Sequence, residues 1–351
     1  MTPLAAILAA RIRAAGPMTL ADYMAESLLH PEHGYYATRD PFGRAGDFIT
    51  APEIHQMFGE LCGLALAQAW LDQGAPAPFT LAEIGPGRGT LMADMLRAIR
   101  VVPGMVDAAE VALIEASPHL RQVQRDRLGE VTHLERAEDL PDQPLFLIAN
   151  EFFDALPIRQ FQHDGRGWAE RMVTLDGDRL AYALSLAPLN RPGRAGEVAE
   201  ICPAAPAIMA AIAGRIAAYG GAAVVIDYGG WDGQGNTFQA LRGHAPDDPL
   251  AHPGHADLTA HVDFAPLARA ARVAGAQVSA MTTQGDWLLS LGAAQRAARL
   301  AAAGDGGAAA ALKRLTDPAE MGQLFKVLAI WPKGAPPVPG TEVLDEDADD
   351  A

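Results

Sequence analysis

The segment 79–99 constrains the fold of this 351-residue chain more than any other part of the sequence. It begins with an apolar run that contains one carboxylate, Glu83, and it ends in a helix-like run over 90–99. Between them lies a turn with glycines at every second position, namely Gly85, Gly87 and Gly89. Glycine has no Cβ, so a strand that turns at glycines and continues as a helix lets a ligand lie against bare backbone. The segment therefore predicts a strand, a ligand-binding turn and a helix within an α/β fold.

The spacing of these glycines indicates the kind of ligand. Dinucleotide folds use G-x-G-x-x-G, which seats a pyrophosphate on the helix N-terminus. Here the pattern is E-x-G-x-G-x-G, with Pro86 inside the turn. The carboxylate of Glu83 would repel a pyrophosphate and attract the ammonium and sulfonium of S-adenosylmethionine. We therefore predict S-adenosylmethionine as the cofactor; the alternative is a strand–turn–helix whose glycines serve only the turn.

A second strand supports the same prediction. Residues 111–115 form an apolar run that ends in an acid, Glu115. In nucleotide-binding folds an acid at this place accepts hydrogen bonds from the ribose hydroxyls. Its distance from the glycine turn exceeds the usual ~20 residues, and the Pro- and Gly-containing segment 100–107 accounts for the excess as a longer loop. Glu115 is thus a predicted cofactor contact.

Charge and composition exclude several classes of protein. The net charge of −16 argues against sequence-independent nucleic-acid binding, which needs a basic surface. Half of the residues are apolar, so the chain can form a full core. The longest apolar stretch, 204–226, is interrupted by Arg215 and three glycines, so we expect no membrane span. The two cysteines, Cys62 and Cys202, fit buried small hydrophobes in a reducing compartment, and we expect the cytoplasm.

The order of the expected elements indicates one elaborated α/β domain. Strand-like runs alternate with helix-like runs, as in right-handed βαβ units with a parallel sheet. We expect a helical extension with a lid loop over 1–78, helices at 3–14, 20–29 and 53–71 within it, and the main domain over 79–331. Two insertions interrupt that domain, an antiparallel one at about 158–200 and a Gly-, His- and Asp-rich one at 230–262. The acidic segment 332–351 is expected to be disordered.

Polar residues follow further predicted strands, and ligands bind beyond the carboxyl ends of strands in such sheets. The strand at 145–149 runs into Asn150, Glu151 and Asp154, and the strand at 222–226 runs into Asp227 and Tyr228. An arginine acceptor stays protonated, so carboxylates are needed to hold it. We predict Glu151, Asn150 and Asp154 as catalytic residues. Asn150 is also a predicted cofactor contact, and Asp227 and Tyr228 are predicted substrate contacts. The structural alternative for Asp154 is a helix cap, and one of Phe152 and Phe153 is expected in the core.

Two loops supply further candidates. Asp47 and Thr50 precede a helix start at Pro52, and they either form that turn or belong to a lid over the cofactor. The segment 244–263 holds four histidines and four aspartates without a recognised metal-ligand spacing, so we predict no metal. Asp257 and His261 could instead line a substrate channel.

With these segments described, the chain resembles the MidA-type methyltransferases, the family of the mitochondrial complex I assembly factor that methylates a protein arginine. The resemblance spans nearly the whole chain in seven blocks: HPEHGYYATRDPFGRAGDFITAPEIHQMFGE, LAEIGPGRGTL, LIANEFFDALPIRQF, VVIDYGG, RGHAPDDPLAHPGHADLTAHVDF, TQGDWLLSLG and MGQLFKVLAI. The sequence departs from the family at Ala51 and His55, where serines are expected.

The resemblance implies a class I (Rossmann-like) methyltransferase fold, with a mostly parallel seven-stranded sheet, helices on both faces and helical additions. It implies S-adenosylmethionine as methyl donor and symmetric dimethylation of an arginine on the NuoD-type subunit during respiratory complex I assembly. A homodimer is a further candidate assembly. The alternatives are a methyltransferase for another protein or a small molecule, and a catalytically silent assembly chaperone; an NAD-dependent dehydrogenase is disfavoured by Glu83 and the glycine spacing.

Overall fold

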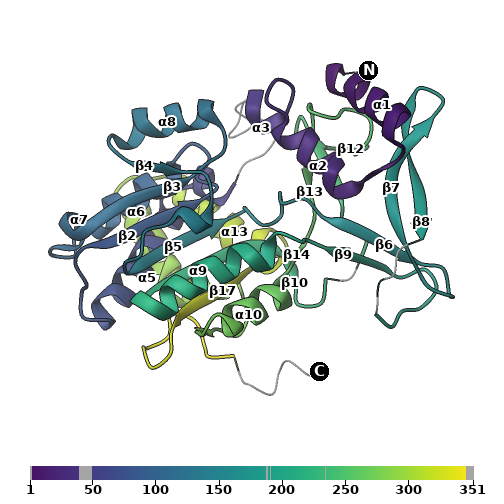
Figure 1. The fold of residues 1–351 in the computed structure, drawn as a ribbon. Helices are drawn as coiled ribbons and strands as arrows, with labels where there is room; N and C mark the ends of the chain where they lie inside the picture. Colours follow the sequence, from purple (N-terminus) through teal and green to yellow (C-terminus); the bar gives the residue numbers. More distant parts are fainter. Residues whose placement is uncertain (1, 39–49, 187–188, 190, 234, 345–351) are drawn as a thin grey trace. The chain divides into compact units, whose positions relative to one another are not determined.

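The structure, a computed structural model, describes residues 2–38, 50–186, 189, 191–233 and 235–344 (Figure 1). The chain divides into two units, each assembled from three segments of the sequence. Unit 1 contains residues 1–48, 154–205 and 232–263, and unit 2 contains 49–153, 206–231 and 264–351. The domain boundaries expected at residues 78 and 331 stay a prediction. The expected disorder of 332–351 is wrong for its described part, 332–344, because Val338 is buried and Leu344 N donates to Val278 O at 3.0 Å.

A mixed sheet forms the centre of unit 2. Its strands are β2 (Phe79–Ile84), β3 (Ala109–Ile114), β4 (Thr132–Leu134), β5 (Leu145–Asn150), β10 (Gly221–Gly230), β15 (Ala276–Val278), β16 (Thr282–Thr283) and β17 (Phe325–Pro332). The order is β15-β17-β10-β5-β2-β3-β4, and β16 also pairs with β17. Neighbours from β10 to β4 run parallel, whereas β10, β15 and β16 are antiparallel to β17.

The expected α/β class is confirmed, and the expected mostly parallel seven-stranded sheet is met only in part. Two short strands, β15 and β16, share one edge of β17. Ser279 lies between them: its N–H donates to Ala329 O at 2.9 Å, and its Oγ accepts from Ala329 N at 2.9 Å. A side-chain oxygen thus replaces a backbone partner there, which interrupts the regular ladder.

The registers of the parallel strands align their carboxyl ends at one edge of the sheet. Ile84 of β2 lies beside Ile114 of β3 and Ala149 of β5, and Asn150 lies beside Ile226 of β10. The residues that follow β2, β3 and β5, namely the glycine turn, Glu115 and Glu151, therefore leave the sheet at the same edge, whereas β10 continues through Asp227, which pairs with Lys326 of β17. The strands are buried on both faces and read as continuous apolar runs, as parallel strands generally do.

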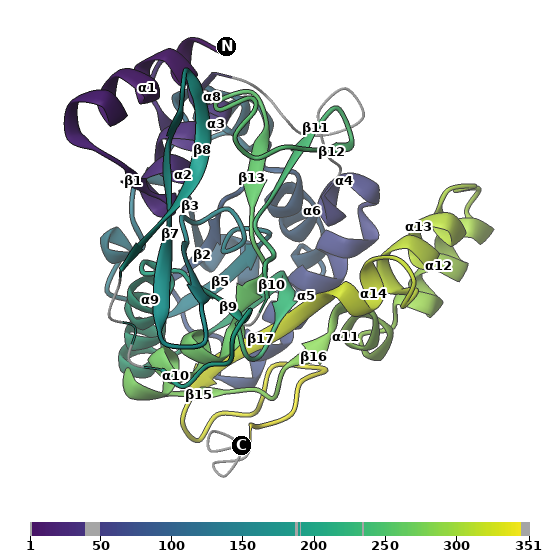
Figure 2. The same ribbon diagram turned by 90° about the vertical axis from the view of Figure 1, so that its right-hand side faces the viewer.

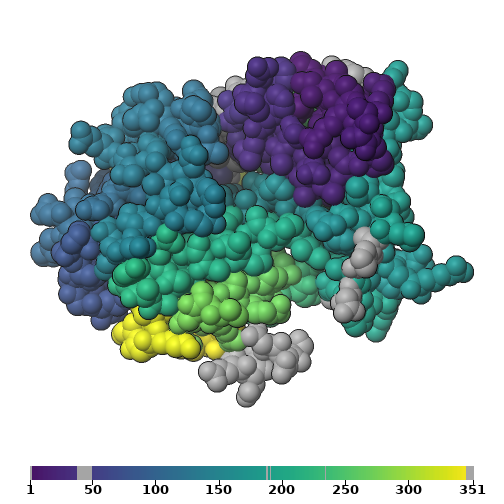
Figure 3. Space-filling view, viewed as in Figure 1, coloured from purple at the N-terminus to yellow at the C-terminus, as the bar shows by residue number. Residues whose placement is uncertain are grey.

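Helices cover both faces of this sheet. They are α4 (Ala51–Ile54), α5 (Met57–Asp72), α6 (Thr90–Ile99), α7 (Met105–Ala108), α8 (Pro118–Leu128), α9 (Ala205–Tyr219), α10 (Phe264–Val273), α11 (Gln284–Ser290), α12 (Ala293–Ala302), α13 (Ala308–Thr316) and α14 (Met321–Leu324), with a 3-10 turn, η1, at Ala137–Asp139. Helices α9 and α10 lie in front of the strands in Figure 1, and their side chains cover this face in the space-filling view (Figure 3). Helices α5, α6, α11, α12 and α13 contribute to the main apolar cluster on the other face, and α11 to α14 lie together (Figure 2).

The single helix expected over 53–71 is wrong in one respect, because it is broken after Ile54. His55 is extended, with φ −166° and ψ 140°, so it cannot continue α4. Its ring Nδ1 accepts a hydrogen bond from Met57 N at 3.1 Å, which satisfies a donor at the start of α5. The break produces two helices, and the short one, α4, belongs to the candidate active site.

Unit 1 combines N-terminal helices with the two inserted segments. Its helices are α1 (Pro3–Ala15), α2 (Leu20–Leu29) and α3 (Tyr35–Thr38). One sheet has the order β1-β7-β6-β9 with β8 on β7, and the other has the order β12-β11-β13. The strands are β1 (Met18–Thr19), β6 (Arg159–His163), β7 (Trp168–Asp176), β8 (Arg179–Leu186), β9 (Val198–Ile201), β11 (Gln239–Arg242), β12 (Ala245–Asp247), β13 (Asp257–Thr259) and β14 (Val262–Asp263). The expected antiparallel insertion is confirmed by the β6–β7 and β7–β8 pairs.

Candidate active site

The glycine turn joins β2 to α6 through three residues in the left-handed region. The φ angles are +68° at Gly85, +50° at Gly87 and +73° at Gly89. A Cβ on Gly85 would lie 3.0 Å from Phe152 Cδ2, so this glycine is also required by close packing. Pro86 O accepts from Gly89 N at 2.7 Å, which closes the turn before α6 begins. The backbone therefore needs these glycines for its own conformation, and the same glycines leave the turn without side chains.

Glu83 is a buried carboxyl group beside this turn. Only 3% of the residue is exposed, and its Oε2 has no hydrogen-bond partner among the described residues. Burial raises the pKa of the Glu83 carboxyl well above its ordinary value, and the negative charge of Glu115 raises it further, while a hydrogen bond from the Met92 backbone opposes both. A buried oxygen without a partner is costly in a folded protein. The ammonium or sulfonium of a bound cofactor would supply the missing partner, so the chemistry of this group fits S-adenosylmethionine.

Asn150 and Glu151 stand at the end of β5. Asn150 Nδ2 donates to Glu151 Oε1 at 3.2 Å, and Asn150 Oδ1 is buried without a partner in the described part of the chain. Glu151 has φ +51°, a strained conformation for a residue with a Cβ. Its Oε1 also accepts from Ala51 N at 3.0 Å. Glu151, the predicted catalytic acid, thus holds the first residue of α4 against the end of β5.

Helix α4 is also tied to the glycine turn. Thr50 is buried and precedes the helix, as predicted for a helix start, but its side chain makes no capping bond. Glu53 Oε1 accepts from Thr90 Oγ1 at 2.6 Å, at the first residue of α6. Together with the Glu151 contact, this bond ties α4 to the end of β5 and to the start of α6. Asp47, the other predicted contact of this loop, lies outside the described residues.

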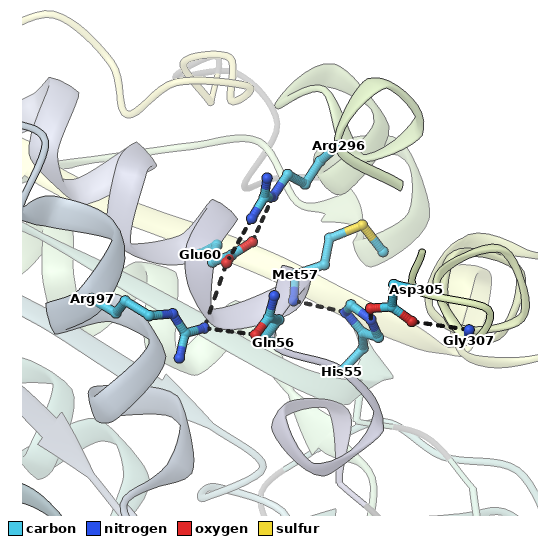
Figure 4. Close-up of polar contacts among 8 residues, drawn as sticks. All are labelled: His55, Gln56, Met57, Glu60, Arg97, Arg296, Asp305 and Gly307. Atoms are coloured by element: carbon cyan, nitrogen blue, oxygen red, sulfur yellow. Dashed lines mark hydrogen bonds and ion pairs between the residues drawn. The ribbon is translucent and has the colours of Figure 1, made fainter. Parts of the chain in front are cut away.

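The start of α5 is fixed by charged side chains from distant helices (Figure 4). Glu60 is buried and accepts from Arg296 of α12 at 2.7 and 2.9 Å, and from Arg97 of α6 at 3.5 Å. His55 Nε2 lies 2.9 Å from Asp305 Oδ2. The histidine that stands where the family resemblance led us to expect serine therefore contributes an anchor for the α4–α5 junction.

Glu115, at the end of β3, is buried and surrounded by hydrogen-bond donors. Its Oε1 accepts from Ser117 N at 2.8 Å and its Oε2 from Gln124 Nε2 at 3.3 Å. Burial raises the pKa of this carboxyl, while these hydrogen bonds and Arg121 oppose the shift. Gln124 is fully buried and was not predicted. The sequence does contain a signal for Gln124. It lies four residues from both Leu120 and Leu128, so the helical period places its amide among the residues of α8 that face inward.

Asp227 is fully buried within β10, directly after Ile226, and its carboxylate is bound by backbone groups. Its Oδ2 accepts from Phe152 N at 3.2 Å and Phe153 N at 2.9 Å, and its Oδ1 accepts from Tyr228 N at 3.0 Å. This carboxylate therefore holds the turn after Glu151, a role that sequence reasoning missed. The half-buried Tyr228 packs its ring edgewise against another aromatic ring. Phe153 is buried, as expected for one of the two phenylalanines.

The remaining predicted residues lie in unit 1. Asp154 is buried and stands in a turn, so the helix-cap interpretation is wrong. Asp257 is buried, and its Oδ1 accepts from Tyr36 Oη at 2.8 Å. Burial raises the pKa of Tyr36, and the charges of Asp257 and Asp154 raise it further. His261 is exposed, and its backbone N–H donates to Thr237 Oγ1 at 2.8 Å. The substrate roles of these residues stay predictions.

The described ranges contain no group of three or more His, Cys, Asp or Glu side chains arranged to hold a metal ion. Within the same residues, every helix is too short or too polar to cross a membrane.

The chain is similar to known methyltransferases over most of its length. Residues 61–282 match a family described as S-adenosyl-L-methionine-dependent methyltransferases. The chain is 36% identical to "Protein arginine methyltransferase NDUFAF7, mitochondrial" of Danio rerio, with 92% of this chain and 85% of that protein covered. Its identity to the human protein of the same name is 38%, with 78% and 69% covered.

Two solved structures are similar over almost the full chain. A Burkholderia thailandensis protein bound to S-adenosyl-homocysteine has a TM-score of 0.85 and 32% identity, and the match covers 96% of this chain and 94% of that one. A native structure from the same organism has a TM-score of 0.84 and 30% identity, with 98% and 96% covered. The bound product of methyl transfer in the first structure agrees with the cofactor that Glu83 and the glycine turn fit.

Proposed function

Because the chain belongs to the family of S-adenosyl-L-methionine-dependent methyltransferases, we propose that it methylates an arginine of a protein substrate. The observation that carries the cofactor site is the buried Oε2 of Glu83, which has no partner among the described residues and lies beside the glycine turn. The protein arginine acceptor is supported by the names of the curated relatives, which are 36–38% identical to this chain.

The residues at the carboxyl edge of the unit 2 sheet would each have a different role in binding the cofactor. Glu83 would balance the positive charge of the cofactor, Glu115 would accept the ribose hydroxyls, and the glycine turn would admit the ligand close to the backbone. S-adenosylmethionine, when bound, supplies a methyl group on a sulfonium. The acceptor nitrogen forms a bond to that carbon as the carbon–sulfur bond breaks, and the nitrogen then loses a proton, which leaves S-adenosylhomocysteine and methylarginine.

We assign the acceptor side to carboxylates, because a guanidinium must be held and must lose a proton during transfer. Glu151 remains the first choice for the group that orients the guanidinium and accepts the proton, with Asn150 beside it. Asp154, Asp227, Tyr228, Asp257 and His261 complete the set of proposed substrate-side residues. Of these, Asp227 already binds three backbone N–H groups, so its proposed contribution is to hold the turn that carries Glu151.

The finer proposal follows the resemblance noted in the sequence. We propose symmetric dimethylation, the type II pattern, on the NuoD-type subunit during complex I assembly, by a chain that forms a homodimer. The expected cytoplasmic location stays a prediction, and the curated relatives carry "mitochondrial" in their names.

Transfer of a deuterated methyl group tests this function. The purified chain, deuteriomethyl S-adenosylmethionine and a recombinant NuoD-type subunit are incubated, and the hydrolysed product is analysed by mass spectrometry. Labelled symmetric dimethylarginine, absent with Gly87→Val, is the expected result. Label on another residue, or on a small molecule in a protein-free extract, would support the alternative acceptors. No label at any acceptor despite cofactor binding would support the silent assembly chaperone.

A further inference from the structure

The side chain of Gln124 links the two halves of the candidate cofactor site. It enters from α8 and is fully buried. Its Nε2 donates to Gly87 O in the glycine turn at 2.6 Å and to Glu115 Oε2 at 3.3 Å. One amide nitrogen thus contacts both groups on which the cofactor prediction rests.

Hydrogen-bond chemistry fixes the orientation of this amide. A carbonyl oxygen and an ionised carboxylate only accept, so the NH₂ of Gln124 must face Gly87 and Glu115. Its Oε1 consequently faces His133 Nε2, at 2.8 Å, and an amide oxygen only accepts. His133 Nε2 must therefore carry a hydrogen. Burial lowers the pKa of His133, and the charges of Arg125 and Arg121 lower it further, which favours the neutral ring with hydrogen on Nε2.

The hydrogen bonds at Glu115 leave acceptor capacity for a ligand. A carboxylate has about four lone-pair positions, two on each oxygen. Ser117 N binds Oε1 and Gln124 Nε2 binds Oε2, so each oxygen is held in place by a donor while it retains acceptor capacity. This arrangement suits a vicinal diol, which presents two O–H donors.

We propose that Gln124 is a positioning residue of the cofactor site: it fixes the carboxylate of Glu115 relative to the backbone of Gly87, and His133 fixes Gln124. Gln124 contributes to the affinity for the cofactor indirectly, because it orients Glu115, which contacts the ribose hydroxyls. The proposal rests on the proposed function, because it takes the turn and Glu115 as the cofactor site. It goes beyond that function in assigning roles to Gln124 and His133.

Calorimetric titration with two ligands tests the proposal. The ligands are S-adenosylhomocysteine and its analogue without the two ribose hydroxyls, and the proteins are the wild type, Gln124→Met and Gln122→Met. Gln122 is exposed on the same helix, where it donates to Asp126 and accepts from Arg125, so it is a matched control for the same substitution. Loss of a hydrogen bond to a charged group predicts that Gln124→Met weakens S-adenosylhomocysteine binding about tenfold or more. Binding of the analogue should change less than about threefold.

If Gln124 had a merely structural role, Gln124→Met would weaken the binding of both ligands to the same extent, and that result would overturn the proposal. Unchanged binding of S-adenosylhomocysteine would also overturn it. Failure of the wild type to bind S-adenosylhomocysteine would instead overturn the proposed function. If Gln124→Met does not fold, His133→Phe carries the test, because it frees the amide to rotate and should show the same preference between ligands to a smaller extent. Nitrogen NMR of the wild type should show neutral His133 with hydrogen on Nε2, and hydrogen on Nδ1 would contradict the assigned orientation.

Discussion

Replacing Glu83 by glutamine should make the empty protein more stable while it damages cofactor binding. Burial raises the pKa of Glu83 well above 4.5, the ordinary value for this group. Between pH 4.5 and the raised pKa the folded state binds more protons than the unfolded state, so the stability of the wild type falls as pH rises. Each pH unit costs about 1.4 kcal/mol, so the cost reaches at most about 3 kcal/mol at pH 7. Glutamine has a similar volume and does not titrate, so it avoids this cost.

Urea unfolding of the wild type and Glu83→Gln between pH 4.5 and 7.5 measures this difference. The advantage of the variant should grow with pH, toward the limit of about 3 kcal/mol at pH 7. Glu130→Gln, the same substitution at an exposed position, is the matched control. A constant difference across the pH range, or a variant that is less stable at pH 7, would refute the reasoning, since either result means that Glu83 is ionised and paired in the empty protein.

The same carboxyl predicts a proton linked to binding. A bound cation favours the ionised form of Glu83, so S-adenosylmethionine binding should release a proton and strengthen as pH rises. Titration calorimetry in two buffers of different ionisation enthalpy measures this release. Glu83→Gln should bind more weakly and release no proton at this site. Equal proton release by the wild type and the variant would show that another group is responsible.

Three further substitutions test individual contacts. Gly85→Ala should weaken cofactor binding and lower stability by about 1 kcal/mol or more, because φ is +68° and the new Cβ meets an aromatic ring at 3.0 Å. Thermal unfolding and titration measure the two effects. Gly177→Ala, at φ +60° with open space around it, is the control for backbone strain. Asp227→Asn should destabilise unit 2 by about 2 kcal/mol in urea unfolding, since an amide NH₂ replaces an oxygen that accepts backbone N–H groups, and unchanged stability would contradict this role. Arg296→Met should cost about 2 kcal/mol, because two hydrogen bonds to the buried carboxylate of Glu60 are lost, and a loss below about 0.5 kcal/mol would show that this pair is unimportant.

Much of the unit 2 fold was predictable because local pattern and tertiary structure agree there. The apolar run at 79–84, the glycine turn and the helix at 90–99 were all expected and are present as β2, the turn and α6. Buried parallel strands leave a clear apolar signal, and left-handed glycines are recognisable from their spacing. The break at His55 was not predictable, because it depends on hydrogen bonds of one side chain to Met57 and Asp305.

The candidate site was predictable in its residue types and less so in its connections. Glu83 and Glu115 could be identified because acids at strand ends stand out in the sequence. That Asp227 binds the backbone of residues 152 and 153 depends on a contact across about 75 positions, which no local pattern encodes. Gln124 could have been noticed as a polar residue in an apolar stripe, but its partner Gly87 is known only from the fold.

Titration of the purified chain with S-adenosylmethionine, on the wild type and on Gly87→Val, tests the central claim most directly. Gly87 has φ +50°, so valine should distort the turn and occupy space next to the ligand. The predicted result is saturable binding by the wild type that is lost in Gly87→Val and kept in Gly177→Val. Equal affinity in all three proteins, or no binding to the wild type, would contradict a cofactor site at the glycine turn.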